Sequence, residues 1–247
     1  MSKEAEQSYL EKLGDAGWRH SLEKPFSDEH RGVNLASIGA ILSLLPPPPG
    51  RLLDFGCGGG WTSIFFAKCG YEVIGQDISQ AMIELACTNK EINLKNGNLS
   101  FLKSDYENLE FSEEFDCAIF FDSLHHSDDE LAALKSAYRA LKPGGVLITH
   151  EPGAGHSINH GSIEAMKLYG VNERDMPPHL IIEQGGKVGF DGFRVFPMPD
   201  EIHKTFYGKP PPRILSGSGY KLAKRLFKLA FKPSMRASSI VVLRKPA

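Results

Sequence analysis

One glycine-rich turn limits what this chain can fold into more than any other feature. The apolar run Arg51–Phe55 is followed at once by glycines at positions 56, 58, 59 and 60, within the stretch LLDFGCGGG. Glycine lets the backbone turn sharply and lets a ligand approach without a Cβ in the way. A helix predicted from Thr62 to Lys68 follows, so its N-terminal amides point into the same crevice. The stretch therefore predicts a strand, a ligand-binding turn and a helix.

Short apolar runs alternate with helix-period stretches from this turn to Glu151. Strands are predicted at Arg51–Phe55, Tyr71–Asp77, Leu99–Lys103, Phe115–Phe121 and Val146–His150. Helices are predicted at 34–45, 62–68, 79–90 and 127–141, the third capped by Ser79 and the fourth by Ser127 or Asp128, with a turn at 142–145. The alternation favours a Rossmann-like doubly wound α/β fold, a mostly parallel sheet with helices on both faces.

The pattern changes on both sides of this region. Residues 1–50, which end in the prolines at 46–49, are predicted to form a helical segment that covers the site. Residues 51–247 are predicted to be one domain with insertions at about 153–190 and 200–236. We expect a short helix at 162–168 and a chain break at Pro210–Pro212 in the insertions, and further strands at 193–196 and 239–244.

The acid before the glycines indicates which ligand the turn accepts. The dinucleotide pattern G-x-G-x-x-G, started at Gly56, needs a glycine where Trp61 stands. Asp54 is placed to repel a phosphate and to attract a cation. S-adenosylmethionine has no phosphate and carries an ammonium group and a sulfonium, so the turn favours this cofactor over NAD.

Polar residues also end the next predicted strands, in the order that such a cofactor needs. Asp77 can accept both ribose hydroxyls, Asp105 can accept from the adenine amine beside the Tyr106 amide, and Asp122 ends the fourth strand near the methyl group. Ligands of open α/β sheets bind outside the carboxyl ends of the strands. The residues expected to surround the cofactor are Asp54, Gly56, Cys57, Gly58, Gly60, Asp77, Ile78, Asp105, Tyr106, Asp122 and Ser123.

Five stretches spread over residues 51–153 carry a family resemblance: LLDFGCGGGW, VIGQDIS, KSDYENL, FDCAIFFDSLHHSDD and LKPGGVLITHEPG. They resemble the class I S-adenosylmethionine-dependent methyltransferase family, and the closing SSIVVLRKP is similar to that family's last strand. The resemblance implies a seven-stranded sheet whose last strand is antiparallel, with S-adenosyl-L-methionine as the cofactor. It also implies that N-terminal residues such as Trp18, His20 or Arg31 cover the cofactor as a lid.

The methyl-acceptor side is predicted from acids and histidines near the ends of the fourth and fifth strands. A hydroxyl acceptor needs a group that removes its proton during the in-line displacement, and histidine titrates in the right range. The catalytic candidates are His125, His126, Glu151 and His156, although the paired histidines could instead only close over the methionine end. Imidazoles and Glu151 could also bind a divalent ion. No spacing here is a recognised ligand motif, so no metal is expected.

One segment gives a finer indication of the acceptor. The stretch from His150 to Ile182 resembles a version of the family found among bacterial modifiers of sugars and surface polysaccharides. That resemblance implies a glycosyl hydroxyl as the acceptor, and hence O-methylation in polysaccharide modification.

Charge is unevenly distributed along the chain. Residues 201–247 hold 11 Lys and Arg and one acidic residue, a net charge of +10, whereas residues 1–200 hold 17 basic and 29 acidic residues, a net charge of −12. The basic end indicates either an anionic partner or only a solvated face. A basic amphipathic helix is predicted over 220–232. It could lie on an anionic membrane and reach lipid-linked saccharides, or pack its apolar stripe on the sheet.

Taken together, these patterns predict an S-adenosylmethionine-dependent methyltransferase that acts on a hydroxyl of a small molecule or saccharide. The alternatives are an accessory protein that binds the cofactor without turnover and, from the basic end, an RNA-directed methyltransferase. A nucleic-acid acceptor is disfavoured because no motif for a flipped base is present. Four unpaired-looking cysteines, no secretory leader and no apolar run of 18 residues predict a cytoplasmic location, at the inner face of the membrane if helix 220–232 binds there. No oligomeric state is predicted.

Overall fold

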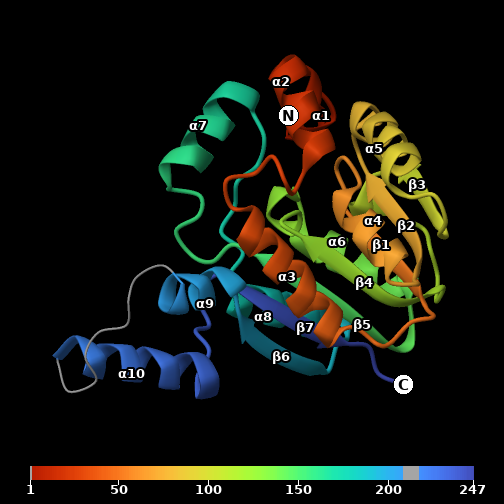
Figure 1. Cartoon of the computed structure of the whole chain (residues 1–247). Helices are drawn as coiled ribbons and strands as arrows, with labels where there is room; N and C mark the ends of the chain where they lie inside the picture. The colour runs from red at the N-terminus through yellow and green to blue at the C-terminus, as the bar shows by residue number, and fades with distance from the viewer. Residues whose placement is uncertain (1, 208–216) are drawn as a thin grey trace.

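Five adjacent strands of the sheet, from β3 at one edge to β5, are parallel (Figure 1). The computed structural model describes residues 2–207 and 217–247, and within them the strand order is β3-β2-β1-β4-β5-β7-β6. Strand β7 runs antiparallel to both of its neighbours, β5 and β6. The strands are β1 Arg51–Phe55, β2 Glu72–Asp77, β3 Leu99–Lys103, β4 Phe115–Phe121, β5 Leu141–Glu151, β6 Gly192–Pro197 and β7 Ser239–Arg244. The predicted fold class, with its antiparallel last strand, is confirmed.

Strand order reverses between β1 and β4. From β1 the chain proceeds outward to β2 and β3, then returns to place β4 on the other side of β1. The connections that leave the carboxyl ends of β1 and β4 therefore go to opposite faces, and a crevice opens between them. This topology puts the glycine-rich turn and the Asp122 region side by side.

Alternation within the central strands divides the core into two layers. Leu52 of β1 and Ile119 of β4 contact one apolar cluster, which also holds residues of α3 Arg31–Leu44 and α4 Trp61–Lys68. Leu53 and Phe120 contact the other, with α6 Glu130–Ala140 and α8 Pro178–Val188. Both faces of the sheet are thus covered, which explains why β4 is apolar at nearly every position.

Most predicted element bounds agree with the structure to within a few residues. Ser79 caps α5 Gln80–Asn93, as predicted, and accepts a hydrogen bond from the Met82 amide. The cap of α6 was predicted wrongly: it is Asp129, which accepts from the Ala132 amide at 3.0 Å, because the Ser127 hydroxyl donates to Leu124 instead.

Three features near the prolines and glycines differ from the prediction. The expected turn at 142–145 lies inside β5 as an irregularity, since pairing jumps from Phe115 with Leu141 to Cys117 with Val146. Helix α8 and helix α9 Pro199–Phe206 were not predicted; each begins at a proline, which is favourable at the first position of a helix. The predicted break at Pro210–Pro212 lies outside the described residues.

The N-terminal helices lie over the carboxyl ends of the strands (Figure 1). They are α1 Ser2–Gln7 and α2 Tyr9–Glu23, with a kink at Gly14. The Ser79 hydroxyl donates to the Gln7 carbonyl at 3.0 Å, which ties α1 to the end of β2. Tyr9 meets Tyr169 of α7 His160–Tyr169 edge to face, with ring centroids 5.2 Å apart. The N-terminal helices and α7 thus cover the crevice together.

Helix α10 Gly217–Phe231 stands away from the sheet (Figure 1). Its leucines are half-buried, but Tyr220, Phe227 and Phe231 are exposed. Arg225 forms an ion pair of 2.5 Å with Glu201 of α9. The apolar stripe is therefore only partly covered by the body. Within residues 2–207 and 217–247, the helices lack the combination of length and apolar character needed to cross a bilayer.

Candidate active site

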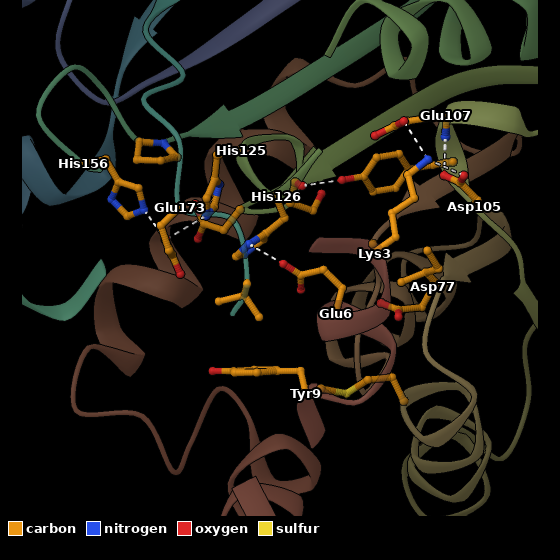
Figure 2. A pocket seen from close by; sticks show the side chains of 18 of the residues that line it. Lys3, Glu6, Tyr9, Asp77, Asp105, Glu107, His125, His126, His156 and Glu173 are labelled. Carbon is orange, nitrogen blue, oxygen red and sulfur yellow. Dashed lines mark hydrogen bonds and ion pairs between the residues drawn. The ribbon is translucent and has the colours of Figure 1, made fainter. Parts of the chain in front are cut away.

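A cavity of about 550 Å³ lies at the carboxyl ends of β1 to β5, under α1 and α2 (Figure 2). Its lining comes from three parts of the chain: the N-terminal helices, the loops after the central strands, and the segment 152–173. The predicted cofactor residues that line it are Gly56, Asp77, Ile78, Asp105, Tyr106, Asp122 and Ser123. The other four, Asp54, Cys57, Gly58 and Gly60, lie in or below the turn rather than on the cavity surface.

The glycine-rich turn is shaped by close approach to its neighbours. Gly56 has φ +64°, and a Cβ added there would lie 2.6 Å from the Cβ of Ser123. The Gly58 amide donates to Asp77 Oδ2 at 2.9 Å. The turn is thereby held against the ends of β2 and β4.

Asp77 ends β2 with its carboxylate facing the cavity and already partly satisfied. Its Oδ2 accepts from Gly58, and its Oδ1 accepts from the Ser79 amide at 2.9 Å. Burial raises the pKa of Asp77, although these two amides favour the ionised form. Each oxygen keeps one further lone pair, so hydroxyl donors from the cavity could still bind.

Asp105 is held by a partner that the sequence did not reveal. Lys3 Nζ of α1 lies 2.6 Å from Asp105 Oδ2 and 2.7 Å from Glu107 Oε2. Burial alone would raise the pKa of Asp105. Hydrogen bonds from the Lys3 ammonium, the Glu107 backbone amide and the Asn108 side-chain amide outweigh this effect and lower the pKa. An N-terminal cation thus sits where the adenine side of the cavity was predicted.

Asp54 lies beneath the turn, with 1% of its surface exposed. Its Oδ2 accepts from the hydroxyls of Thr62 and Ser63 at 2.7 and 2.6 Å. Among the described residues, its Oδ1 has no hydrogen-bond partner. Burial raises the pKa of Asp54 to about 6 against the effect of these two hydroxyls. The carboxylate therefore braces the first turn of α4, and it is not on the cavity surface where a cation would meet it directly.

The end of β4 turns the chain toward the acceptor side. Asp122 has φ +48°, a left-handed conformation that is uncommon outside glycine. Its Oδ1 lies 3.1 Å from His150 Nδ1, and the Ser123 hydroxyl donates to the Phe55 carbonyl at 2.8 Å. Tyr106 donates its hydroxyl to the Ser123 carbonyl at 3.0 Å. These bonds fix the backbone on which His125 and His126 follow.

Glu151 organises the loop after β4 from the end of β5. This fully buried carboxylate accepts from the amides of Ser123 and Leu124 at 3.1 and 2.8 Å, and its Oε2 lies 2.7 Å from His125 Nδ1. Burial raises the pKa of Glu151 to about 8 and lowers the pKa of His125 to about 3. His125 is therefore neutral at pH 7, with its Nε2 toward the cavity. Glu151 supports this imidazole from behind and does not line the cavity.

His126 has a different environment although it is the next residue. Its Nδ1 lies 2.6 Å from the Asn172 carbonyl oxygen and 3.4 Å from Glu6 Oε1. Burial by itself lowers the pKa of His126, but Glu6 and Glu173 outweigh it and raise the pKa to about 9. The two neighbouring histidines thus have pKa values shifted in opposite directions.

His156 joins the same end of the cavity from the insertion after β5. Its Nε2 lies 2.6 Å from Glu173 Oε2, and the same oxygen lies 3.7 Å from His125 Nε2 (Figure 2). Neither Glu173 nor Glu6 was singled out in the sequence, because no local spacing links them to the histidines. Trp18, His20 and Arg31, which were expected to cover the cofactor, are absent from the lining, and Lys3, Glu6 and Tyr9 take that place.

The comparison with protein families decides the identity of this domain. Residues 53–149 match a family described as a methyltransferase domain, and this range includes the glycine-rich turn, Asp77, Asp105 and His125. Residues 53–149 therefore form a class I S-adenosylmethionine-dependent methyltransferase domain. The family prediction is confirmed, and S-adenosyl-L-methionine is the cofactor of this class.

Two curated relatives show the extent of the likeness. The chain is 38% identical over 96 residues to an O-methyltransferase of Aspergillus nomiae. The aligned region covers 38% of this chain and 43% of the relative. The chain is also 35% identical over 104 residues to a ubiquinone biosynthesis O-methyltransferase of Ruegeria pomeroyi. That alignment covers 40% of this chain and 39% of the relative. The chain thus spans about two fifths of the length of these relatives.

A solved structure extends the likeness in fold to nearly the whole chain. Phosphoethanolamine N-methyltransferase 2 of Haemonchus contortus, in complex with S-adenosyl-L-methionine, matches with a TM-score of 0.67 at 23% identity. The match covers 98% of this chain and 60% of that one. The flanking segments of this methyltransferase therefore belong to the same architecture as its central domain.

Proposed function

We propose that this class I methyltransferase transfers the methyl group of S-adenosyl-L-methionine to a hydroxyl oxygen of a small molecule. The observation that carries the proposal is the position of His125, whose Nδ1 is anchored by Glu151 at 2.7 Å while its Nε2 faces the cavity. A group held in this way can help to remove a hydroxyl proton as the oxygen attacks the methyl carbon. The relatives named as O-methyltransferases support a hydroxyl acceptor.

The proposed cofactor position follows from the lining of the cavity. Asp77 would accept from the ribose hydroxyls, Asp105 and Tyr106 would lie beside the adenine, and Asp122 and Ser123 would lie beside the methionine part. Two features of the chain fit this group: the close approach of Gly56 to Ser123, which an added Cβ would prevent, and the Asp54 Oδ1 that has no partner among the described residues. Asp54 would act from below the turn by adding negative charge near the cofactor's ammonium.

The finer proposal is that the acceptor is a saccharide. The segment that resembles polysaccharide-modifying members contributes His156 and Glu173 to the cavity. These side chains, with His126 and Glu6, give the acceptor end several hydrogen-bonding groups, which suits a sugar with many hydroxyls. We also propose that α1 and α2 act as a lid, because Lys3, Glu6 and Tyr9 close the cavity from that side.

Turnover of labelled cofactor tests the proposed activity. The chain is incubated with methyl-tritiated S-adenosylmethionine and a panel of free sugars, nucleotide sugars and phenols, and label in the extracted acceptor is counted. We expect label in at least one hydroxyl acceptor and about a hundredfold less with His125→Gln. The matched control is His160→Gln, which alters an exposed histidine outside the cavity.

Two results would point to the alternatives. Binding of S-adenosylhomocysteine without label in any acceptor would favour an accessory protein. Label in RNA but in no small molecule would favour the RNA-directed enzyme. Absence of S-adenosylhomocysteine binding by folded protein would contradict the proposed cofactor site itself.

We propose in addition that helix α10 rests on an anionic membrane surface. Exposed Phe227 and Phe231 lie on the same helix as four Lys and Arg side chains, and Phe206 and Tyr207 at the end of α9 are also exposed. Aromatic side chains beside a basic face are typical of helices that lie in the interface of a bilayer. Such a position would place the enzyme at the cytoplasmic face of a membrane.

Vesicle co-sedimentation tests this second proposal. We expect binding to vesicles that contain phosphatidylglycerol, little binding to pure phosphatidylcholine, and loss of binding with Lys224→Glu and Lys228→Glu combined. Lys95→Glu, in an exposed turn on another part of the chain, is the control. Failure of the wild type to bind anionic vesicles would contradict the proposal.

A further inference from the structure

Three ligand-bearing side chains converge at the acceptor end of the cavity. His125, His126 and Glu173 each offer one atom, and these atoms all lie within 4.8 Å of one another. His125 Nε2 and Glu173 Oε2 are 3.7 Å apart. Figure 2 shows the three side chains turned toward one another at one end of the cavity. Two imidazoles and one carboxylate in this arrangement form a ligand set that transition metals use.

The second nitrogen of each imidazole is already engaged. His126 Nδ1 lies 2.6 Å from the Asn172 carbonyl oxygen, which can only accept, so this nitrogen carries the proton. His125 Nδ1 lies 2.7 Å from Glu151 Oε2, while Glu151 Oε1 accepts from the backbone amides of Ser123 and Leu124, so the carboxyl group engages this nitrogen and is itself held in place. Nε2 is therefore the nitrogen available to an ion on each ring, and binding at His126 displaces the second proton of its imidazolium. Metal-binding histidines are oriented in this way, by a carboxylate or a carbonyl on the other nitrogen.

Negative charge surrounds the three side chains. Glu6 lies 3.4 Å from His126, Glu151 contacts His125 from behind, and Asp122 lies on the same loop. Two lysines also line the cavity: Lys3 is paired with Asp105 and Glu107, and the charge of Lys24 acts on Asp122. The acceptor end therefore has an excess of carboxylates that a bound cation would balance.

We propose that His125, His126 and Glu173 bind one divalent transition-metal ion whose open positions face the cavity. Two imidazoles favour Zn²⁺, Fe²⁺ or Ni²⁺ over Mg²⁺ and Ca²⁺. His156, 2.6 Å from Glu173, orients the carboxylate, and Glu151 orients His125. The ligand set therefore differs from the combination with Glu151 that the sequence suggested.

A metal ion bound here would help the acceptor hydroxyl to lose its proton. This role rests on the proposed O-methylation. A hydroxyl oxygen at an open position of the ion has a lowered pKa, so its proton passes to water as it binds. The oxygen then forms a bond to the methyl carbon while the carbon–sulfur bond breaks. Sulfur keeps the electron pair and leaves as the neutral thioether of S-adenosylhomocysteine.

Metal binding is measured directly, without reference to turnover. The full chain is dialysed against EDTA and then against buffer, and ZnCl₂, NiCl₂ and MgCl₂ are titrated in separate calorimetric experiments. We expect about one Zn²⁺ per chain, with weak or no Mg²⁺ binding. Glu173→Gln and His126→Gln should each weaken Zn²⁺ binding by tenfold or more, and His156→Gln, which removes only an orienting contact, by less. His160→Gln should leave it unchanged, since His160 is exposed outside the cavity.

Binding of S-adenosylhomocysteine serves as the folding control for each variant. If wild-type chain binds S-adenosylhomocysteine but no Zn²⁺ or Ni²⁺, or if Glu173→Gln and His126→Gln bind Zn²⁺ as well as wild type does, the proposed metal site is wrong. Turnover that persists in the metal-free chain would also overturn it and leave His125 Nε2 as the proton acceptor. Zn²⁺ binding without turnover of any hydroxyl acceptor would leave the site in place and contradict the proposed function instead.

Discussion

Lys3 Nζ, on the first helix, lies 2.6 Å from Asp105 Oδ2, which follows the third strand. This ion pair connects the start of the chain to the side of the cavity where the adenine is proposed to bind. Lys3 also contacts Glu107 at 2.7 Å, so two carboxylates that follow β3 hold α1 over the cavity.

Loss of this pair should weaken cofactor binding slightly. Lys3 and Asp105 are partly exposed, so the pair contributes only about 0.2–1 kcal/mol. Lys3→Ala should therefore raise the Kd for S-adenosylhomocysteine by about two- to fivefold, mostly through faster dissociation, in stopped-flow and calorimetric measurements. Lys95→Ala should change neither value. An unchanged dissociation rate in Lys3→Ala would show that α1 does not retain the cofactor.

Removal of the Glu151 carboxylate should destabilise the fold as well as the site. Glu151→Ala leaves the buried amides of Ser123 and Leu124 without an acceptor, and each such loss costs about 1–3 kcal/mol. We expect a decrease of about 3 kcal/mol in the free energy of unfolding by urea. Glu151→Gln keeps one carbonyl acceptor and should lose less stability. Equal losses for the two variants would mean that the carboxylate is not the acceptor that holds this loop.

The turn offers two glycines with similar backbone conformations and different surroundings. Both have positive φ, +64° at Gly56 and +52° at Gly58, but an added Cβ at Gly56 meets Ser123 at 2.6 Å whereas one at Gly58 meets nothing within 4 Å. Gly58→Ala should cost about 1 kcal/mol of stability, the backbone strain alone. Gly56→Ala should cost more and should weaken S-adenosylhomocysteine binding more than tenfold. Similar affinities in calorimetry would contradict the role given to the Gly56 contact.

Asp54 should make stability depend on pH in a defined direction. Its pKa in the fold, about 6, is higher than the ordinary 3.8, so the folded state binds the proton more tightly than the unfolded state does. The resulting stabilisation is fully present below about pH 4 and is lost as pH rises through about 6. Across this range the contribution of Asp54 to the free energy of unfolding falls by about 3 kcal/mol.

Asp54→Asn removes this titration, so the comparison of two unfolding curves isolates it. The stability of the cofactor-free wild type should fall relative to that of Asp54→Asn between pH 4 and pH 8. Urea unfolding at several pH values measures the difference. Parallel curves for the two proteins would show that Asp54 keeps an ordinary pKa in the fold.

The central fold could be predicted because its signals are local. Strands such as Phe115–Phe121 are apolar on both faces, and the turn at Gly56 has its own composition, so both appear in the sequence without knowledge of the packing. Helices α8 and α9 were missed because a proline can either end a helix or begin one, and the neighbouring residues do not decide between the two.

The candidate site could be predicted only where strand order determines it. Asp77, Asp105 and Asp122 follow consecutive strands, so their convergence follows from the parallel sheet. Lys3 and Glu173 reach the cavity from segments whose positions depend on long-range packing, and nothing in their local sequence marks them. Asp54 was placed at the right end of the right strand, but the direction of its side chain was decided by the hydroxyls of Thr62 and Ser63.

The anchoring of segment 152–177 bears on how this enzyme could diversify. Its start is fixed to the chain before β7, since the Gly153 amide donates to the Ser238 hydroxyl and the Ala154 amide donates to the Arg236 carbonyl. The segment brings His156 and Glu173 to the cavity while the glycine-rich turn stays on separate loops. In the proposed arrangement, acceptor preference could therefore change during evolution, by substitution or by exchange of this segment between homologues, without altering the residues proposed to hold the cofactor.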